Sequence, residues 1–186
     1  GVIDIPGFYG SEEIDSEGKR FVTSVTADVE ELVIKMKDAG VQAIVLDLRR
    51  NGGGLLNEAV DLTGLFISRG PVVQVKDSYG KILPRSDRNP KVVYNGPLAV
   101  LTSRHSASAS EILAGALQNY GRALIIGNDS THGKGSVQQV LPLEDYVLRA
   151  YNSKSKAGAA KLTIQKYYLP NGFSVQRKGV VSDISI

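Results

Sequence analysis

Three serines alternate with two alanines at residues 106–110, and Glu111 follows them. An apolar, strand-like run precedes this segment at residues 98–102, and a helix-like run follows it at residues 112–120. A hydroxyl at the start of a helix is well placed for nucleophilic attack, because backbone N–H groups point outward there and the helix dipole favours developing negative charge. The residue types alone leave the choice among the three serines open.

A serine hydroxyl is a poor nucleophile until a base takes its proton. His105 adjoins the serines and His132 lies further along the chain, although a surface or loop position is the plainer interpretation of either histidine. A third candidate is Lys134, which stands between two glycines after an apolar run. Burial disfavours the ammonium form, so a buried lysine can act as a base near neutral pH. The alternative is that Lys134 is a structural lysine.

A glycine run, Gly52 to Gly54, also follows a strand-like segment. It is either a flexible turn or a place where the backbone comes close enough to a substrate for an N–H group to bind an oxyanion. Loops at the carboxyl ends of parallel strands meet at one edge of a sheet. The glycine run, the serines and the lysine loop can therefore share one pocket.

The segment from Gly127 to Ser136 has some likeness to the phosphate-binding pattern G-x-x-x-x-G-K-[ST]. Asn128 stands where the first glycine belongs, and Lys134 is followed by Gly135 in place of serine or threonine. A strand-like run follows where the pattern requires a helix. Nucleotide binding is therefore disfavoured.

The spacing of apolar residues predicts an α/β layered fold. Helices are expected at residues 26–40, with Thr26 as the cap, and at residues 56–66 and 108–120. Strands are expected at residues 2–5, 41–48, 71–75, 98–102, 123–127, 136–140, 146–151 and 161–169. Residues 9–18 and 83–91 are expected to be loops, and the last third of the chain is expected to be rich in strands.

Composition bounds the class of protein. The chain has 186 residues, of which 42% are hydrophobic and 22% charged, as in a soluble domain with a substantial core. The net charge is only +3, and the densest basic cluster, residues 154–161, contains no aromatic residue, so we expect a solvated loop there and no nucleic-acid binding. The lack of cysteine excludes disulfides and thiol catalysis, and no apolar run reaches the ~18 residues of a membrane span. The abrupt start within a strand-like run, without a visible signal peptide, predicts a fragment of a longer protein.

Five segments together resemble the C-terminal processing peptidases, also called tail-specific proteases, and most nearly the bacterial periplasmic members. Members of this family are serine endopeptidases with a serine–lysine dyad. The segments are D-L-R-R-N-G-G-G at 47–54, S-A-S-A-S-E-I at 106–112, Y-G-R-A at 120–123, G-K-G-S-V-Q-Q at 133–139 and R-K-G-V at 177–180. They occur in the order in which the family has them.

The resemblance implies a role for individual residues. Ser108, the middle serine, matches the nucleophile, and Lys134 matches the general base. Gln138 matches a glutamine that helps to position the lysine. The backbone N–H groups of Gly54 and Ala109 match the donors of the oxyanion hole. The two outer serines, at positions 106 and 110, are then structural.

The resemblance also implies a fold similar to the Clp protease and crotonase type, with β-β-α units in a layered α/β core and a strand-rich C-terminal part. It implies no cofactor and no metal ion. The expected partners are protein or peptide substrates with apolar C-termini, bound in extended form. Residues 1–186 would then be a protease core domain, with a PDZ domain in the parent protein and a periplasmic or cell-envelope location.

The chain departs from the family pattern at two places. The loop at residues 127–133 is one residue longer than usual, and Asn119 stands where the nearest relatives have an acid. Two alternatives to a protease share the fold, namely a catalytically silent peptide-binding scaffold and a crotonase-like enzyme of acyl-thioester chemistry. The retention of Ser108, Lys134 and Gln138 argues against the second.

Overall fold

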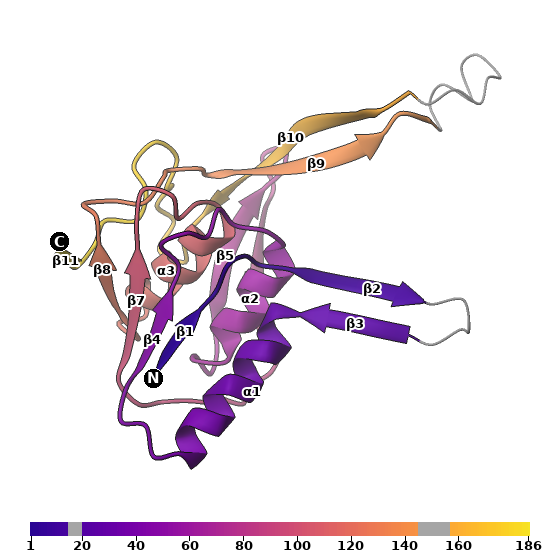
Figure 1. Cartoon of the computed structure of the whole chain (residues 1–186). Helices are drawn as coiled ribbons and strands as arrows, with labels where there is room; N and C mark the ends of the chain where they lie inside the picture. The colour runs from indigo at the N-terminus through magenta and orange to yellow at the C-terminus, as the bar shows by residue number, and fades with distance from the viewer. Residues whose placement is uncertain (15–19, 145–156) are drawn as a thin grey trace.

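The computed structural model describes residues 1–14, 20–144 and 157–186. Within these ranges the central layer is a sheet of five parallel strands in the order β1-β4-β7-β8-β11 (Figure 1). The strands are β1 (Val2–Asp4), β4 (Ile44–Asp47), β7 (Leu98–Thr102), β8 (Leu124–Gly127) and β11 (Ile184–Ser185). Leu46 on β4 and Val100 on β7 are fully buried, as is typical of parallel strands covered on both faces.

The described helices are α1 (Val25–Asp38), α2 (Leu56–Gly64) and α3 (Ala109–Asn119). Helix α1 begins after Ser24, which has an extended backbone conformation. The Ser24 side-chain oxygen caps the helix by accepting from the N–H of Ala27 at 3.3 Å. It ends just before Gly40, which has a φ of 74°. Helix α3 is buried along nearly its whole length, so it is the central helix of the domain.

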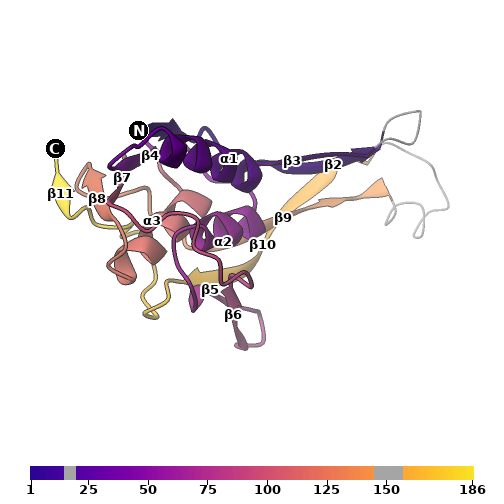
Figure 2. The ribbon, with the colours of Figure 1, turned by 90° about the horizontal axis from the view of Figure 1, so that it is seen from below.

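A second, antiparallel sheet has the strand order β6-β5-β10-β9. Its strands are β5 (Pro71–Lys76), β6 (Ile82–Ser86), β9 (Ser136–Pro142) and β10 (Ala159–Tyr168). Helices α2 and α3 lie between the two sheets (Figure 2), and α3 contacts both β8 and β5. The predicted α/β class with a strand-rich C-terminal part is therefore confirmed.

The predicted loop at residues 9–18 is wrong over its described part. Residues 10–14 form β2 (Gly10–Ile14), which pairs in antiparallel register with β3 (Arg20–Ser24) to make a projecting hairpin (Figure 1). The stretch around Ser11 has no apolar alternation, so its strand character comes from pairing with β3. The hydroxyls of Ser11 and Thr23 lie 2.9 Å apart across that pairing.

Other predictions need smaller corrections. Residues 83–91 were expected to be a loop, yet β6 includes the first part of them. All five residues of β6 are exposed, so the strand has no alternation of apolar and polar residues by which the sequence could have revealed it. The cap of α1 is Ser24 and not Thr26, because Ser24 already holds the extended conformation that precedes a helix. The strand expected at 41–48 is limited to β4. The strand expected at 146–151 lies outside the described residues.

The loops that follow three strands of the parallel sheet lie at the same edge of that sheet. The loop after β4 contains the glycine run, the loop after β7 contains Ser106 and Ser108 and leads into α3, and the loop after β8 contains Lys134. Because β4, β7 and β8 are adjacent and parallel, these loops are neighbours in space. The fold thus places the candidate residues at the carboxyl edge of the sheet.

Candidate active site

A pocket of about 370 Å³ opens at this edge. It is formed by the three loops together with the start of α3 and residues of β9 and β10. All five residues that the family resemblance assigns to the site line this pocket: Gly54, Ser108, Ala109, Lys134 and Gln138. The remaining lining residues are Gly52, Leu55, Leu56, Ile112, Ser136, Val137, Lys161 and Tyr167.

Ser108 differs from the two neighbouring serines in both conformation and exposure. Its φ of 57° and ψ of −111° are rare for a residue other than glycine, and such a conformation costs about 1–3 kcal/mol. It is half-buried and faces the pocket. Ser106 and Ser110 are buried, and their hydroxyls donate to the carbonyls of Leu48 at 2.7 Å and Asn51 at 2.8 Å. The structure therefore separates one serine at the pocket from two structural ones.

The fully buried Asn51 ties the glycine run to the serine loop. Its side chain donates to the carbonyl of Ile5 at 2.9 Å and accepts from the N–H of Gly53 at 2.8 Å, while its own carbonyl accepts from the N–H of Ala107 at 3.2 Å. Gly53 has a φ of 108°, and a Cβ at this position would lie 2.9 Å from the Cβ of Ser108. The close approach of these two loops therefore requires glycine here.

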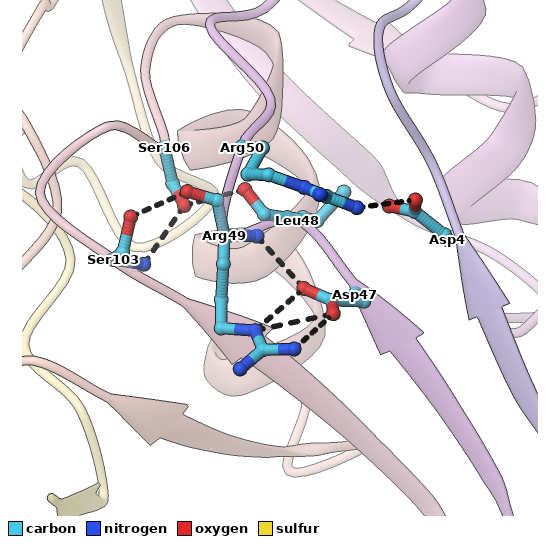
Figure 3. Close-up of polar contacts among 7 residues, drawn as sticks. All are labelled: Asp4, Asp47, Leu48, Arg49, Arg50, Ser103 and Ser106. Carbon is cyan, nitrogen blue, oxygen red and sulfur yellow. Dashed lines mark hydrogen bonds and ion pairs between the residues drawn. The ribbon is translucent and has the colours of Figure 1, made fainter.

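Charged residues fix the outer part of the loop that follows β4 (Figure 3). Asp47 accepts hydrogen bonds from the Arg49 backbone N–H and Nε at 3.0 Å and from its Nη2 at 2.6 Å. These side-chain bonds are the main reason that the pKa of Asp47 is lowered. Arg50 pairs with Asp4 at 2.8 Å, and the Ser103 hydroxyl donates to the Arg49 carbonyl at 2.5 Å. The loop after β4 is thus joined both to β1 and to the serine loop.

Two residues that line the pocket, Gly54 and Ala109, have backbone N–H groups without an acceptor among the described residues. Ala109 occupies the first position of α3, where an N–H has no partner within the helix. Gly54 has a φ of 147°, and a Cβ there would lie 2.3 Å from the carbonyl oxygen of Phe8. Among the described residues neither N–H has a hydrogen-bond partner. Both are available to a substrate oxygen.

Glu111 connects the serine loop to the lysine loop. Its carboxylate is fully buried and accepts four hydrogen bonds. Oε1 accepts from the Thr131 hydroxyl and the Gly133 N–H, both at 2.6 Å. Oε2 accepts from the Ser108 N–H at 2.8 Å and from the Lys134 N–H at 2.9 Å. Because Oε2 accepts from both nitrogens, the main-chain nitrogens of Ser108 and Lys134 are separated by less than twice the length of one hydrogen bond.

Lys134 is half-buried, so the burial expected from its glycine-flanked position is only partial. Its loop rests against the segment near residue 177. Gly133 has a φ of 87°, and a Cβ there would lie 3.0 Å from backbone atoms of Arg177. The Gly135 N–H donates to the Gln176 side chain at 2.8 Å. These contacts place the lysine motif directly beside residues 176 and 177.

Other candidate residues occupy different surroundings. His105 and His132 are both exposed and do not line the pocket, in agreement with the plainer interpretation of each. Gln138 is an exposed residue of β9 at the pocket wall. Asn119 lies at the end of α3, where its side chain accepts from the Asn171 N–H at 3.2 Å and does not line the pocket.

Two buried residues at the site were given no role from sequence. Glu111 was part of the serine motif, and its place three residues after a serine at a helix start is the capping-box pattern, which could have drawn attention to it. Tyr167 stands on β10 with nothing in its sequence neighbourhood to mark it. Its burial, and secondly the charge of Glu111, raise the pKa of its hydroxyl well above the ordinary range, so it remains a hydrogen-bond donor.

A larger hollow of about 760 Å³ lies between α1, α2 and β6. Its walls carry side chains of both charges and none of the predicted catalytic residues. In the part of the chain that the structure describes, no helix is long and apolar enough to cross a membrane. The same residues contain no group of three or more histidine, aspartate or glutamate side chains placed to bind a metal ion.

Comparison with known proteins identifies the family. The family model of peptidase family S41 matches residues 1–186. The tail-specific protease of Haemophilus influenzae is 45% identical over 184 residues, and the carboxy-terminal-processing protease of Bartonella bacilliformis is 37% identical over 165 residues. The solved structure of a photosystem II D1 C-terminal processing protease covers the whole chain with a TM-score of 0.77 and 31% identity. The chain belongs to peptidase family S41.

The chain is short beside these relatives. The matches cover 99% and 88% of this chain but only 24% of the Haemophilus protein and 35% of the Bartonella protein. The structural match covers 42% of the D1-processing protease. What the chain shares with them is therefore the region that contains the pocket.

Proposed function

We propose that this chain is the protease core domain of a serine endopeptidase, in which Ser108 is the nucleophile and Lys134 is the general base. The observation that carries the proposal is the convergence of both side chains on one pocket with two unpaired N–H groups. Family membership supports the reaction class, since the relatives are named as processing proteases.

The reaction begins with neutral Lys134, whose Nζ takes the proton of the Ser108 hydroxyl while Oγ attacks the scissile carbonyl carbon. The oxyanion that forms accepts hydrogen bonds from the N–H groups of Gly54 and Ala109. The Lys134 ammonium then protonates the leaving amine, which yields an acyl-enzyme. Water, activated by the neutral lysine, hydrolyses the ester and restores Ser108. Gln138, at the pocket wall, orients the lysine.

The base must be neutral for this sequence of steps. Lys134 is only half-buried in the free protein. A peptide bound across the pocket excludes water from the amine, and exclusion of water disfavours a charged group. Substrate binding therefore favours the neutral form of the Lys134 amine, which is the form that can act as the base.

The substrate binds as an extended strand. Strand β9 pairs with β10 along one side and is an edge strand on the other. Its first residues, Ser136 and Val137, line the pocket, so a peptide that pairs with this edge passes beside Ser108. Leu56 and Ile112, also in the lining, offer an apolar surface for one substrate side chain.

The parent protein is proposed to select substrates by an apolar C-terminus, through a PDZ domain, in the periplasm or cell envelope. The names of the relatives support action at a C-terminus, and their greater length leaves room for a further domain. The domain assignment of residues 1–186 as a protease core belongs to the same proposal.

The test is cleavage of a reporter protein with an apolar C-terminal tail by the full-length protein. We expect Ser108→Ala and Lys134→Ala each to abolish cleavage while circular dichroism shows an intact fold. Lys166→Ala, an exposed lysine outside the pocket, is the matched control and should retain activity. Cleavage that persists in Ser108→Ala would contradict the proposal, and binding without cleavage by the wild type would favour a silent scaffold.

A further inference from the structure

Tyr167 lies on β10 at the wall of the pocket, and its side chain is fully buried. Its hydroxyl oxygen is 2.6 Å from the carbonyl oxygen of Lys134 and 3.2 Å from that of Ser108. A phenol has a single hydrogen to donate. The shorter distance indicates a strong bond to the Lys134 carbonyl with a weaker shared component to Ser108. One side chain therefore contacts the main chains of both members of the dyad.

Glu111 makes the complementary contacts on the other side of the same two residues. Its Oε2 accepts from the N–H groups of Ser108 and Lys134, whereas Tyr167 donates to their carbonyls. The two peptide segments are thus joined by an acceptor at their N–H groups and by a donor at their C=O groups.

We propose that Tyr167 is a positioning residue that fixes the separation and orientation of the Ser108 and Lys134 main chains, and thereby the approach of the lysine amine to the serine hydroxyl. The inference rests on the proposed serine–lysine mechanism. The side chain of Lys134 is long and flexible, so the place from which it starts decides what it reaches. A misplacement of about 1 Å in such a pair can lower the rate on the order of 100-fold.

The hydroxyl can be removed without removing the strand that carries it. The backbone N–H of Tyr167 donates to the Gly135 carbonyl at 3.0 Å, and this bond is independent of the side chain. Phenylalanine keeps the buried ring and loses only the donor. Tyr167→Phe is therefore a specific test, since β10 remains attached to the lysine loop.

The chain contains a matched control for a buried tyrosine hydroxyl. The Tyr94 hydroxyl also lies near two carbonyls, those of Gln42 at 3.4 Å and Pro97 at 3.2 Å, and Tyr94 does not line the pocket. Tyr94→Phe removes the same group from a similarly buried place. Tyr168→Phe removes a hydroxyl from the next residue of the same strand, which also does not line the pocket.

The experiment measures peptide cleavage by the full-length protein and, separately, the acylation rate of Ser108 by a small β-lactone, which uses no peptide subsites. For Tyr167→Phe we expect kcat to fall about 10-fold to 100-fold with KM changed less than about twofold. The acylation rate should fall by the same factor. For Tyr94→Phe and Tyr168→Phe we expect both rates to stay within about twofold of wild type, even where Tm falls.

Three results would overturn the inference. One is a Tyr167→Phe variant whose kcat and acylation rate match wild type while Ser108→Ala is inactive, which refutes the positioning role alone. Another is an equal loss of kcat in Tyr94→Phe, which would assign the effect to general destabilisation. The last is cleavage that persists in Ser108→Ala, which refutes the underlying mechanism as well.

Discussion

Replacement of Glu111 by glutamine tests how the site is held together. The carboxylate accepts from four donors, and glutamine retains one oxygen and substitutes an NH₂ group for the other. If the amide oxygen faces the N–H groups of Ser108 and Lys134, the NH₂ group faces Thr131 and Gly133. The Thr131 hydroxyl can turn to accept a hydrogen bond, whereas the Gly133 N–H cannot and loses its acceptor.

The expected loss of stability follows from these contacts. A buried donor without an acceptor costs about 1–3 kcal/mol, and a hydrogen bond to a neutral acceptor is weaker than one to a charged acceptor by about 1 kcal/mol. Loss of the buried charge offsets part of this cost. We therefore expect Glu111→Gln to lower the free energy of unfolding by about 2–5 kcal/mol, against a total of about 5–15 kcal/mol for a typical domain.

The measurement is urea-induced unfolding followed by circular dichroism. The control is Asp77→Asn, because Asp77 accepts from the backbone N–H groups of Tyr79 and Lys81 in an exposed turn, and its replacement should cost about 1 kcal/mol or less. A loss below about 1 kcal/mol in Glu111→Gln would refute the claim that this carboxylate joins the serine and lysine loops.

Three further predictions concern charge. Lys134→Arg should abolish cleavage although it preserves the positive charge, because guanidinium stays protonated at working pH; a variant with residual turnover near wild type would contradict the role of the lysine as base. The lowered pKa of Asp47 means that its carboxylate stabilises the fold at pH values above its unfolded-state pKa of about 3.9, and that this contribution is lost as the pH falls through the lower folded-state pKa. The Tm of Asp47→Asn should therefore lie below that of wild type at pH 7 and approach it below about pH 4. A Tm difference that does not depend on pH would refute this. None of the described residues lining the pocket is acidic, and Lys161 is one of them. Lys161→Glu should therefore lower kcat/KM for peptides with an acidic residue near the scissile bond by about threefold to tenfold relative to peptides with a basic residue there, whereas Lys166→Glu should not. Equal effects of the two variants would show that Lys161 does not set selectivity.

The sequence was sufficient to predict the three helices and the strands β1, β4, β7 and β8 of the central sheet, because each buries apolar residues. The fifth strand, β11, was missed, because both of its residues are exposed. The strand at 98–102 is apolar except for the buried Thr102 and was located correctly. The hairpin of β2 and β3 and the strand β6 were missed because their residues are largely exposed and their strand character depends on pairing with a partner. Burial, which apolar periodicity detects, is absent there.

The site was predicted only as far as its motifs extended. Residue types alone did not separate Ser108 from its neighbours, and the structure does so through the burial of Ser106 and Ser110 and the positive φ of Ser108. The contacts of Tyr167 with the two loops join positions far apart in the chain, and no local pattern encodes them. Such contacts exist only once the fold has brought the strands together.

The serine–lysine mechanism requires that Ser108 becomes acylated with the help of Lys134. The most direct measurement is mass spectrometry of the full-length protein after reaction with a small β-lactone, with the modified residue located by peptide mapping. We predict one acyl group on Ser108, none on Ser106 or Ser110, and a loss of the adduct in Lys134→Ala. An adduct on another residue, or an equal yield in Lys134→Ala, would contradict the serine–lysine mechanism.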